Sequence, residues 1–515
     1  PPPLFFLIIR RTPISKPLSS SASSFLFNTH ILYYNFFRIR DVGAIKNIMD
    51  NKNKKFYFIA IGGIGMSGLA KYLLEMGCSV SGSDIKESKY TKKVEALGAK
   101  VYIGHDANHI EPDMTVVAST AIRDDNPEKI RAKELGLPVL HRSDVLKMIS
   151  EGLGHEVQQF IGFSGTHGKT TTSGLCSYVL EKAGLDPSYC VGGIIPDLDT
   201  NAKFGGGKFF VAELDESDGT IVKYHTSVSV INNLEVDHVD FYKNGFDDLL
   251  KTFRKHIDNR VEGGKVIVNK DCNGIKKLIA ANPDVKFTTF GIESGNLDYS
   301  ARNMKFTEFG SEFDVYHHSQ KLVSLKLTIT GKHNIYNALA VTAALNEENV
   351  DLEKVRPHFE TFSGMGRRFQ KVAEFDGIRI FDDYAHHPTE IKTTLDSARL
   401  CNTDRLVAIF QPHRYTRLKG LWEDFKKSFG AVDKLIVVDV YSASEDAIEG
   451  INSKAFVQSF QNEDVTYVGG SMENAARKIL PLLKSGDMVI TLGAGDVTRI
   501  GGELKKLHDE QTAGV

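Results

Sequence analysis

Two glycine-rich segments constrain the fold most strongly, because each lies between a strand-length apolar run and a helix-like pattern. The first, AIGGIGMSGLA, spans residues 60–70, and the second, FIGFSGTHGKTTTSG, spans residues 160–174. A glycine-rich turn between a strand and a helix lets phosphate oxygens approach the amides at the helix start. At roughly 150 residues per domain, 515 residues also suggest about three domains. The pattern therefore predicts a multidomain α/β protein with two nucleotide sites.

Composition and charge exclude several classes of protein. Hydrophobic residues make up 41% and charged residues 25% of the chain, as in soluble globular proteins. Lys and Arg number 63 against 65 Asp and Glu, which argues against a nucleic-acid or membrane-surface binder. Five scattered cysteines indicate neither a disulfide framework nor a metal site, and no apolar run reaches the ~18 residues of a membrane span. We expect a cytoplasmic protein without membrane insertion, and leave its oligomeric state open.

Residues 1–48 differ in composition from the rest of the chain. They are rich in serine, contain arginine and lack acidic residues before Asp41, which is typical of organelle transit peptides. The alternative is a translated upstream or artefactual segment, with Met49 as the natural start. We favour this alternative, expect the extension to be disordered, and leave it out of the fold prediction.

The first glycine-rich segment predicts a Rossmann-like domain over residues 49–153. An apolar strand over 56–61, a helical pattern and a second strand from Ser79 follow one another. An acidic residue lies about 20 residues after the glycines, where dinucleotide-binding folds contact a ribose. NAD and a UDP-sugar both offer a pyrophosphate and a ribose, so the ligand stays open at this point. The predicted binding residues are Gly63, Ile64, Gly65, Met66, Ser67, Gly68 and Asp84.

The second glycine-rich segment predicts an ATP-binding loop in a central domain over residues 154–361. The strict P-loop spacing would place a glycine at Phe163, whereas the glycines stand at Gly162 and Gly165. The chemistry is retained, because free amides, a lysine and a hydroxyl can hold phosphates and Mg²⁺. The predicted ATP-binding residues of this loop are Gly165, Thr166, His167, Gly168, Lys169, Thr170 and Thr171.

Carboxylates at strand ends predict a magnesium site beside that loop. The apolar run 209–212 ends at Glu213, with Asp215, Glu216 and Asp218 close behind. Four carboxylates would be costly to bury without a cation, although on an exposed loop they would be solvated. A further strand over 228–231 leads to His238, which alone is as readily a hydrogen-bonding residue as a ligand. Together with Thr170 and Glu213, it indicates a two-metal site.

The third domain, residues 362–515, contributes histidines and arginines. The strand IRIF is followed by Asp382, Asp383 and the adjacent His386 and His387. Neighbouring histidines point in different directions, so separate contacts are more plausible than joint chelation. His413, Arg414 and Arg417 form a cationic cluster suited to a carboxylate or phosphate, or else a surface ion-pair network.

The motifs GTHGKTTT, AELDESDG, NNLEVDHVD and GKHNIYNALAV resemble the central domain of the Mur ligases, the ATP-dependent amide-forming enzymes of peptidoglycan precursor synthesis. Their loop has the form G-T-x-G-K-[ST]-[ST], which accounts for Phe163. The resemblance implies Lys169 on phosphate, Thr170 and Glu213 on one Mg²⁺, and His238 on a second. It also implies Asn334 and Asn337 near the adenine and ribose of ATP.

DYAHHPTEI, FQPHRYTR, TLGAGDVTRI and GGIGMSGLA are similar to the muramate-specific branch of that family. The resemblance implies a UDP-sugar-binding Rossmann-like domain, a P-loop ATPase-type domain and a C-terminal Rossmann-like domain. It also implies that L-alanine is joined to the lactyl carboxylate of UDP-N-acetylmuramate through an acyl phosphate. The implied catalytic residues are Lys169, Glu213, His238, His413, Arg414 and Arg417. A ligase for a recycled tripeptide, an NAD-dependent oxidoreductase and a nucleotide-sensing module remain alternatives.

Overall fold

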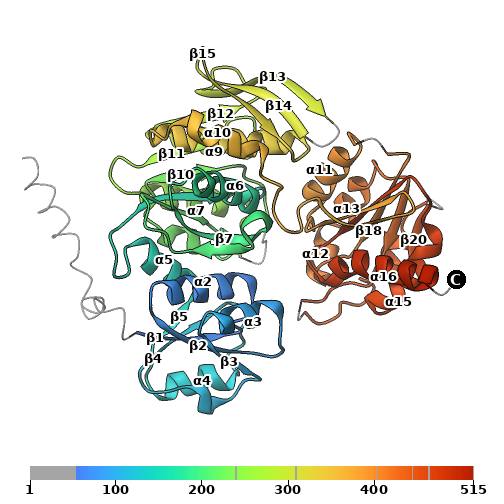
Figure 1. Cartoon of the computed structure of the whole chain (residues 1–515), viewed down its shortest axis with the longest axis horizontal. Coiled ribbons are helices and arrows are strands. Elements are labelled where there is room, and N and C mark those ends of the chain that lie inside the picture. Colours follow the sequence, from blue (N-terminus) through green and yellow to red (C-terminus); the bar gives the residue numbers. More distant parts are fainter. Residues whose placement is uncertain are drawn as a thin grey trace, which may run out of the picture. The chain divides into compact units, whose positions relative to one another are not determined.

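The computed structural model describes residues 54–237, 241–307, 310–401, 403–443, 445–461 and 464–513. The predicted extension 1–48 and His238 lie outside these ranges, so the predicted disorder of the extension and the predicted metal binding by His238 stay predictions. The described strands form three sheets (Figure 1). Within these ranges, no helix is both long enough and apolar enough to cross a membrane.

The first sheet carries five parallel strands in the order β3-β2-β1-β4-β5. The strand order reverses between β1 and β4, and in open α/β sheets ligands bind beyond the carboxyl ends of the strands at such a point. The first glycine-rich segment follows β1 at this edge. Its strands are β1 (Lys55–Ile59), β2 (Ser79–Asp84), β3 (Lys100–Ile103), β4 (Met114–Ala118) and β5 (Val139–His141); its helices are α2 (Ile64–Glu75), α3 (Lys89–Ala96), α4 (Pro127–Glu134) and α5 (Arg142–Ser150).

The second sheet has ten strands in the order β15-β14-β13-β12-β11-β10-β6-β9-β7-β8. β6 lies between β9 and β10 and is parallel to both, so the loop after β6 meets the carboxyl ends of its two neighbours. Strands β13 to β15 are an antiparallel extension, drawn in yellow in Figure 1. Buried apolar side chains of α6 and α9 belong to one core cluster with this sheet.

The strands of the second sheet and its flanking helices follow the order that the sequence predicts. The strand predicted over 228–231 is observed with those bounds, and the apolar run 209–212 belongs to a strand ending at Glu213. Its strands are β6 (Gln159–Ser164), β7 (Ser188–Ile195), β8 (Thr200–Lys203), β9 (Phe209–Glu213), β10 (Val228–Ile231), β11 (Lys265–Asn269), β12 (Phe287–Gly291), β13 (Tyr299–Thr307), β14 (Gly310–His317) and β15 (Gln320–Leu327); its helices are α6 (Lys169–Lys182), α7 (Phe246–Asp258), α8 (Asn273–Ala281), α9 (Lys332–Glu347) and α10 (Leu352–Glu360).

The third sheet has six strands in the order β16-β17-β21-β18-β19-β20. Only β16 is antiparallel to its neighbour, so the carboxyl ends of the other five strands share one edge. Its strands are β16 (Gln370–Phe375), β17 (Ile378–Asp383), β18 (Arg405–Phe410), β19 (Lys434–Val437), β20 (Val465–Tyr467) and β21 (Asp487–Leu492); its helices are α11 (Pro388–Ala398), α12 (Tyr415–Gly420), α13 (Trp422–Ser428), α14 (Ser453–Gln458), α15 (Met472–Ile479) and α16 (Ile500–Ala513).

Local chemistry explains where several elements begin and end. The strand predicted over 56–61 ends at Ile59, because Ala60 adopts φ 64° and turns the chain into the glycine-rich segment. Helix α11 begins at Pro388, whose fixed φ suits a first helical position, and the His387 side chain caps it by accepting from the Thr389 amide. The three sheets fit the predicted three-domain α/β class. The boundaries drawn at residues 153 and 361 stay predictions.

Candidate active site

The second glycine-rich loop is held against the end of β10. Thr166 N donates to Asn233 O at 3.1 Å, and His167 N donates to Asn233 Oδ1 at 2.7 Å. Gly165 adopts φ 116° and Gly168 adopts φ 82°, which is the left-handed region. A side chain at Gly165 would also meet Asn233 O at 2.7 Å. Glycine at both positions therefore shapes a loop whose amides can face phosphate oxygens.

Lys169 begins α6, and its side chain is largely covered at that loop, with 14% exposure. Its Nζ donates to Gly165 O at 2.6 Å and Thr166 O at 3.1 Å, and lies 3.0 Å from Oε2 of Glu216. Burial lowers the pKa of the Lys169 ammonium, but the nearby carboxylates, Glu216 first, outweigh burial and raise this pKa. Lys169 is therefore a fixed cation at the second glycine-rich loop.

Thr170 and Glu213 bring two oxygen donors together beside Lys169. Thr170 Oγ1 donates to Glu213 Oε2 at 2.8 Å, and the same carboxylate oxygen accepts from Gly192 N at 2.9 Å. A side chain at Gly192 would meet that oxygen at 2.2 Å, so the strand leaves room for the carboxylate. A hydroxyl and a carboxylate are ligands that Mg²⁺ prefers, and the donors fit this ion.

The acidic residues after β9 form ion pairs with basic side chains of two different domains. Glu216 pairs with Lys169, whereas Asp215 Oδ2 accepts from Arg142 Nη2 at 2.8 Å, at the start of α5 in the first domain. Burial raises the pKa of Asp215, but Lys169 and Arg142 lower it to about 2. The carboxylates thus find protein cations, and one short loop contacts both the second glycine-rich loop and the first domain.

The first glycine-rich segment packs against the central domain. Asn201 Nδ2 donates to Ile64 O at 2.8 Å, and a side chain at Gly68 would meet the same nitrogen at 2.7 Å. Asp84 Oδ2 accepts from Gly62 N at 2.9 Å, so this carboxylate holds the turn that precedes the predicted ribose site. Met66 and Ser67 are buried on α2, whereas Ile64 is exposed.

A small cleft of about 90 Å³ lies between the first glycine-rich segment and residues of the central domain. Gly65 and Gly68 line it from the first domain, together with Arg142, and Glu213 and Asp215 line it from the central domain. The first glycine-rich segment and Glu213 therefore face the same cleft.

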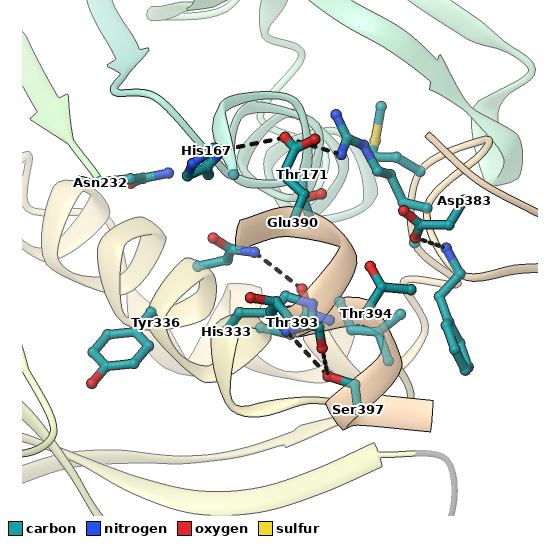
Figure 2. A pocket seen from close by; sticks show the side chains of 18 of the residues that line it. His167, Thr171, Asn232, His333, Tyr336, Asp383, Glu390, Thr393, Thr394 and Ser397 are labelled. Carbon is teal, nitrogen blue, oxygen red and sulfur yellow. Dashed lines mark hydrogen bonds and ion pairs between the residues drawn. The ribbon is translucent and has the colours of Figure 1, made fainter. Parts of the chain in front are cut away.

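A larger cavity of about 1060 Å³ extends from the second glycine-rich loop to α11 of the third domain (Figure 2). Residues 165–171 of this loop are called the ATP-type loop from here on. His167, Gly168 and Thr171 line one side, and Asn334 and Asn337 of α9 line another. The two asparagines are fixed, because Asn337 Nδ2 donates to Asn334 Oδ1 at 3.0 Å and Asn334 Nδ2 donates to Thr330 O at 2.7 Å. Its volume matches a site for a nucleotide-sized ligand.

The structure brings His413, Arg414 and Arg417 of the third domain together near the start of α12. Nη1 of Arg417 lies 3.2 Å from Nδ1 of His413, and Arg414 lies 4.0 Å from the Glu445 carboxylate. Nη2 of Arg417 also lies 4.0 Å from Oδ1 of Asp237 in the central domain. Burial lowers the pKa of His413 to about 3, and the cationic neighbours add to this effect, so the ring is neutral.

His386 and His387 make separate contacts, as predicted. His386 Nδ1 lies 2.9 Å from Tyr384 O, whereas His387 Nδ1 accepts from Thr389 N at 3.3 Å.

Sequence reasoning missed Arg142 and Arg368. Arg142 follows β5 at the carboxyl edge of a parallel sheet, where ligands bind, and this position was a usable signal. Arg368 lines the large cavity, and its guanidinium lies over the Tyr384 ring at 5.4 Å. Its neighbour Arg367 was an equally good candidate in the sequence, so nothing there distinguished the two.

Fold and site together define a three-domain α/β enzyme with two nucleotide-type loops that meet at an acidic segment. Three domain families match the chain in order. They are the Mur ligase family, catalytic domain, over residues 55–152; the Mur ligase middle domain, over residues 163–345; and the Mur ligase, glutamate ligase domain, over residues 367–495. The chain belongs to the Mur ligase family, whose members depend on ATP.

Individual relatives are similar over nearly the whole chain. The UDP-N-acetylmuramate–L-alanine ligase of Geotalea daltonii is 39% identical over 90% of this chain and 100% of its own. That of Dictyoglomus turgidum is 41% identical over 88% and 96%, respectively. The crystal structure of UDP-N-acetylmuramate-alanine ligase MurC from Thermotoga maritima has a TM-score of 0.75 and 28% identity, covering 89% of this chain and 99% of that one. A murein peptide ligase from Psychrobacter arcticus, 22% identical with a TM-score of 0.66 over 88% and 98%, shares the fold.

Proposed function

We propose that this chain is the ligase that joins L-alanine to UDP-N-acetylmuramate, with ATP converted to ADP and phosphate, in peptidoglycan precursor synthesis. Relatives with that name are similar over 90% and 88% of this chain. The observation that carries the proposal is the acidic segment, in which Glu216 pairs with Lys169 of the ATP-type loop and Asp215 pairs with Arg142 of the first domain. Such a connection suits a reaction between ATP and a second nucleotide-bearing substrate.

The chemistry explains why two nucleotide loops are needed. A carboxylate does not react with an amine at neutral pH, because it is a stabilised anion without a leaving group. A lactyl carboxylate oxygen attacks the γ phosphorus of ATP, ADP leaves, and an acyl phosphate forms. The neutral amine of L-alanine then attacks the acyl carbon, and the tetrahedral intermediate loses phosphate and a proton to give the amide.

Residues of the ATP-type loop would stabilise the transferring phosphoryl group. The Lys169 ammonium and the loop amides offset its negative charge, which contributes orders of magnitude to the rate. Thr170, Glu213 and His238 would hold Mg²⁺, which when bound neutralises phosphate charge. Thr170 and Glu213 already share a hydrogen bond of 2.8 Å. Asn334 and Asn337 line the cavity in which the adenosine would lie.

The first and third domains would position the other two substrates. The loop from Gly63 to Gly68, with Asp84 beside it, would hold the UDP group and so place the lactyl carboxylate near Glu213. His413, Arg414 and Arg417 would bind the L-alanine carboxylate or the acyl phosphate, since Arg forks suit both groups. The contact of Arg417 with Asp237 supports this role, because it joins the cationic cluster of the third domain to the central domain.

We place this activity in the cytoplasm. All five cysteines lie in the described part of the chain, where no disulfide is formed, which suits a reducing compartment.

Measurement of ADP release tests the proposal. Release should require both UDP-N-acetylmuramate and L-alanine. The tripeptide that a recycling ligase attaches to UDP-N-acetylmuramate should not replace L-alanine. Lys169→Ala should lower kcat by about 10²–10³-fold while UDP-sugar binding persists. Release that is independent of both substrates would overturn the ligase assignment, and lost UDP-sugar binding would overturn the division between the two loops.

A further inference from the structure

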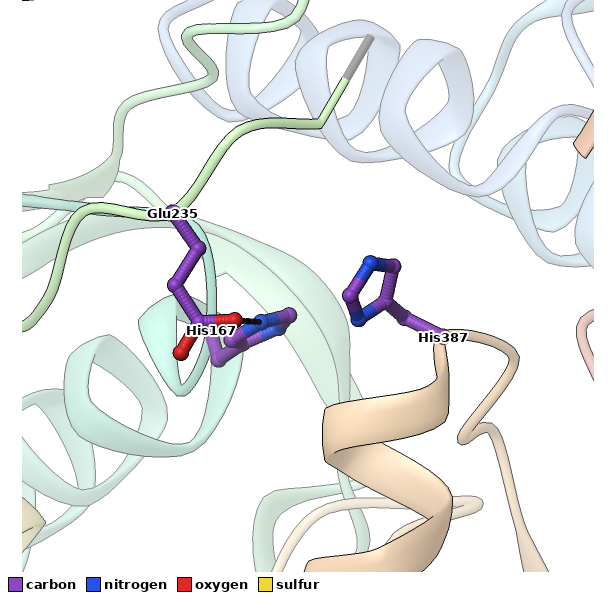
Figure 3. Close-up of side chains that lie close together, drawn as sticks. All are labelled: His167, Glu235 and His387. Carbon is purple, nitrogen blue, oxygen red and sulfur yellow. Dashed lines mark hydrogen bonds and ion pairs between the residues drawn. The ribbon is translucent and has the colours of Figure 1, made fainter. Parts of the chain in front are cut away.

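Three metal-ligating side chains meet where the ATP-type loop faces the third domain (Figure 3). His167 belongs to the loop before α6, Glu235 follows β10, and His387 caps α11. One donor atom from each lies within 4.8 Å of the others. Nε2 of His167 lies 3.3 Å from Oε2 of Glu235, and the two imidazole centroids are 5.2 Å apart. The cluster shares no residue with the Thr170–Glu213 pair.

The His167 ring is oriented as a metal-ligating histidine usually is. Its Nδ1 lies 3.2 Å from Oε1 of Glu390, a carboxylate whose side chain is 13% exposed. A carboxylate that accepts from one ring nitrogen fixes the tautomer and directs the other nitrogen toward a metal. Nε2 of His167 is the nitrogen that faces Glu235. Glu390 therefore serves as the orienting partner.

His387 supplies the second nitrogen from the other domain. It is 7% exposed, and its Nδ1 accepts the Thr389 amide at 3.3 Å. In that tautomer Nε2 carries the proton, so a cation binds at Nε2 only when the proton moves to Nδ1 and this long bond is given up. Among the described residues, no hydrogen bond is formed by its Nε2, and Figure 3 shows the ring turned toward His167 and Glu235. Glu235 is held in place, because Thr389 Oγ1 donates to its Oε2 at 3.0 Å. Two imidazoles and one carboxylate thus converge from two domains.

We propose that His167, Glu235 and His387 form a binding site for a transition-series divalent cation of the Zn²⁺ class, separate from the oxygen-donor site for Mg²⁺. Imidazole nitrogens with one carboxylate suit zinc and its neighbours in the first transition row, whereas Mg²⁺ takes oxygen ligands. Three protein ligands leave a fourth position open to water or to a phosphate oxygen of a ligand in the adjoining cavity. A bound ion would connect the ATP-type loop to α11.

Equilibrium dialysis of the metal-stripped full chain against ZnCl₂ with excess Mg²⁺, followed by metal analysis, tests the site. We expect one Zn²⁺ per chain. His387→Asn retains a good helix cap but removes the Nε2 donor, and Glu235→Gln retains an acceptor for Thr389. Each substitution should weaken Zn²⁺ binding at least about 10-fold. The two variants change different domains, so a folding failure in one leaves the other informative.

Two matched controls locate the ion. His386→Asn removes the adjacent histidine, and Glu213→Gln alters the oxygen-donor pair; both variants should keep the zinc. Substitution of Co²⁺ should give a visible d–d spectrum without a thiolate charge-transfer band, which excludes binding by cysteine. The proposal is overturned if the wild-type chain binds no Zn²⁺, if His387→Asn and Glu235→Gln bind it as the wild type does, or if Glu213→Gln alone loses it.

Discussion

Nζ of Lys169 lies 3.0 Å from Oε2 of Glu216, and both side chains are largely buried, at 14% and 3% exposure. The ammonium also donates to two loop carbonyls, so three groups fix it at the start of α6. Glu216 therefore gives the ATP-type loop a counter-charge of its own. Phosphate groups bound in the loop would present a second set of negative charges to the same lysine.

Glu216→Gln should lower the free energy of unfolding by about 3 kcal/mol, because it leaves a buried ammonium without its counter-charge. The loss lies at the low end of the range for broken buried pairs, since two carbonyl acceptors remain. ATP should stabilise this variant more than it stabilises the wild type, because bound phosphates replace the missing charge. Urea unfolding with and without ATP measures both effects.

Glu473→Gln is the control for that experiment. It removes an exposed helix pair with Arg477, at 52% and 56% exposure, and should change the free energy of unfolding by less than about 0.5 kcal/mol. Equal losses in the two variants would mean that the buried pair has no special role.

Gly192→Ala should raise the Mg²⁺ concentration needed for half-maximal activity by about 10-fold or more. The new Cβ would stand 2.2 Å from Oε2 of Glu213, so that carboxylate must move away from Thr170. A flexible side chain can yield, and we therefore expect a folded protein with an impaired ion site. Initial rates across a Mg²⁺ titration measure the effect. Gly430→Ala, where no atom lies within 4 Å of the new Cβ, should leave the titration unchanged; an unchanged titration for Gly192→Ala contradicts the assignment of Glu213.

His256 should make the central domain sensitive to acid. The side chain is fully buried on α7, where Nε2 accepts from Ser229 Oγ at 2.7 Å and Nδ1 donates to Ile221 O at 3.1 Å. Burial lowers its pKa from 6.5 to about 4, although the Ile221 carbonyl opposes the change. Below pH 6.5 the unfolded chain binds a proton that the folded chain does not, so stability falls as the pH drops from 6.5 toward 4. The total loss is about 3 kcal/mol.

Denaturant unfolding at pH 7 and pH 4.5 measures this dependence. His256→Gln cannot titrate but can bond both partners, so the difference between the two pH values should shrink by up to about 3 kcal/mol; His413, whose pKa is also lowered by burial, should keep the remaining part. His225→Gln, at a half-exposed position, should retain it. An equal pH dependence in the His256 variant and the wild type would show that another group is responsible.

The glycine-rich loops were predictable because their determinants are local. Strand, turn and helix follow one another in the sequence, and Gly165 and Gly168 adopt conformations that favour glycine. The Thr170–Glu213 pair was predictable in kind, because both residues end or follow strands that proved to be neighbours in one sheet. The sequence order alone could not place β6 between β9 and β10, and the structure supplies that placement.

Contacts between domains could not be predicted, since they depend on how separate sheets pack. The Arg142–Asp215 and His167–Glu390 pairs join segments that no local pattern relates. The four carboxylates after β9 did raise the question of which cations balance them. Lys169 and Arg142 balance them. This could not be read from the sequence, because Arg142 belongs to the first domain and the carboxylates belong to the central domain.

Transfer of oxygen from the substrate to phosphate tests the central claim most directly. UDP-N-acetylmuramate labelled with ¹⁸O in both lactyl carboxylate oxygens should be incubated with the enzyme, ATP and L-alanine. If the carboxylate oxygen attacks the γ phosphorus and phosphate later leaves the acyl carbon, each turnover places one ¹⁸O in the inorganic phosphate. Mass spectrometry of the phosphate should therefore show one labelled oxygen per amide formed. Unlabelled phosphate, or label found in AMP, would contradict phosphoryl transfer between the two nucleotide sites.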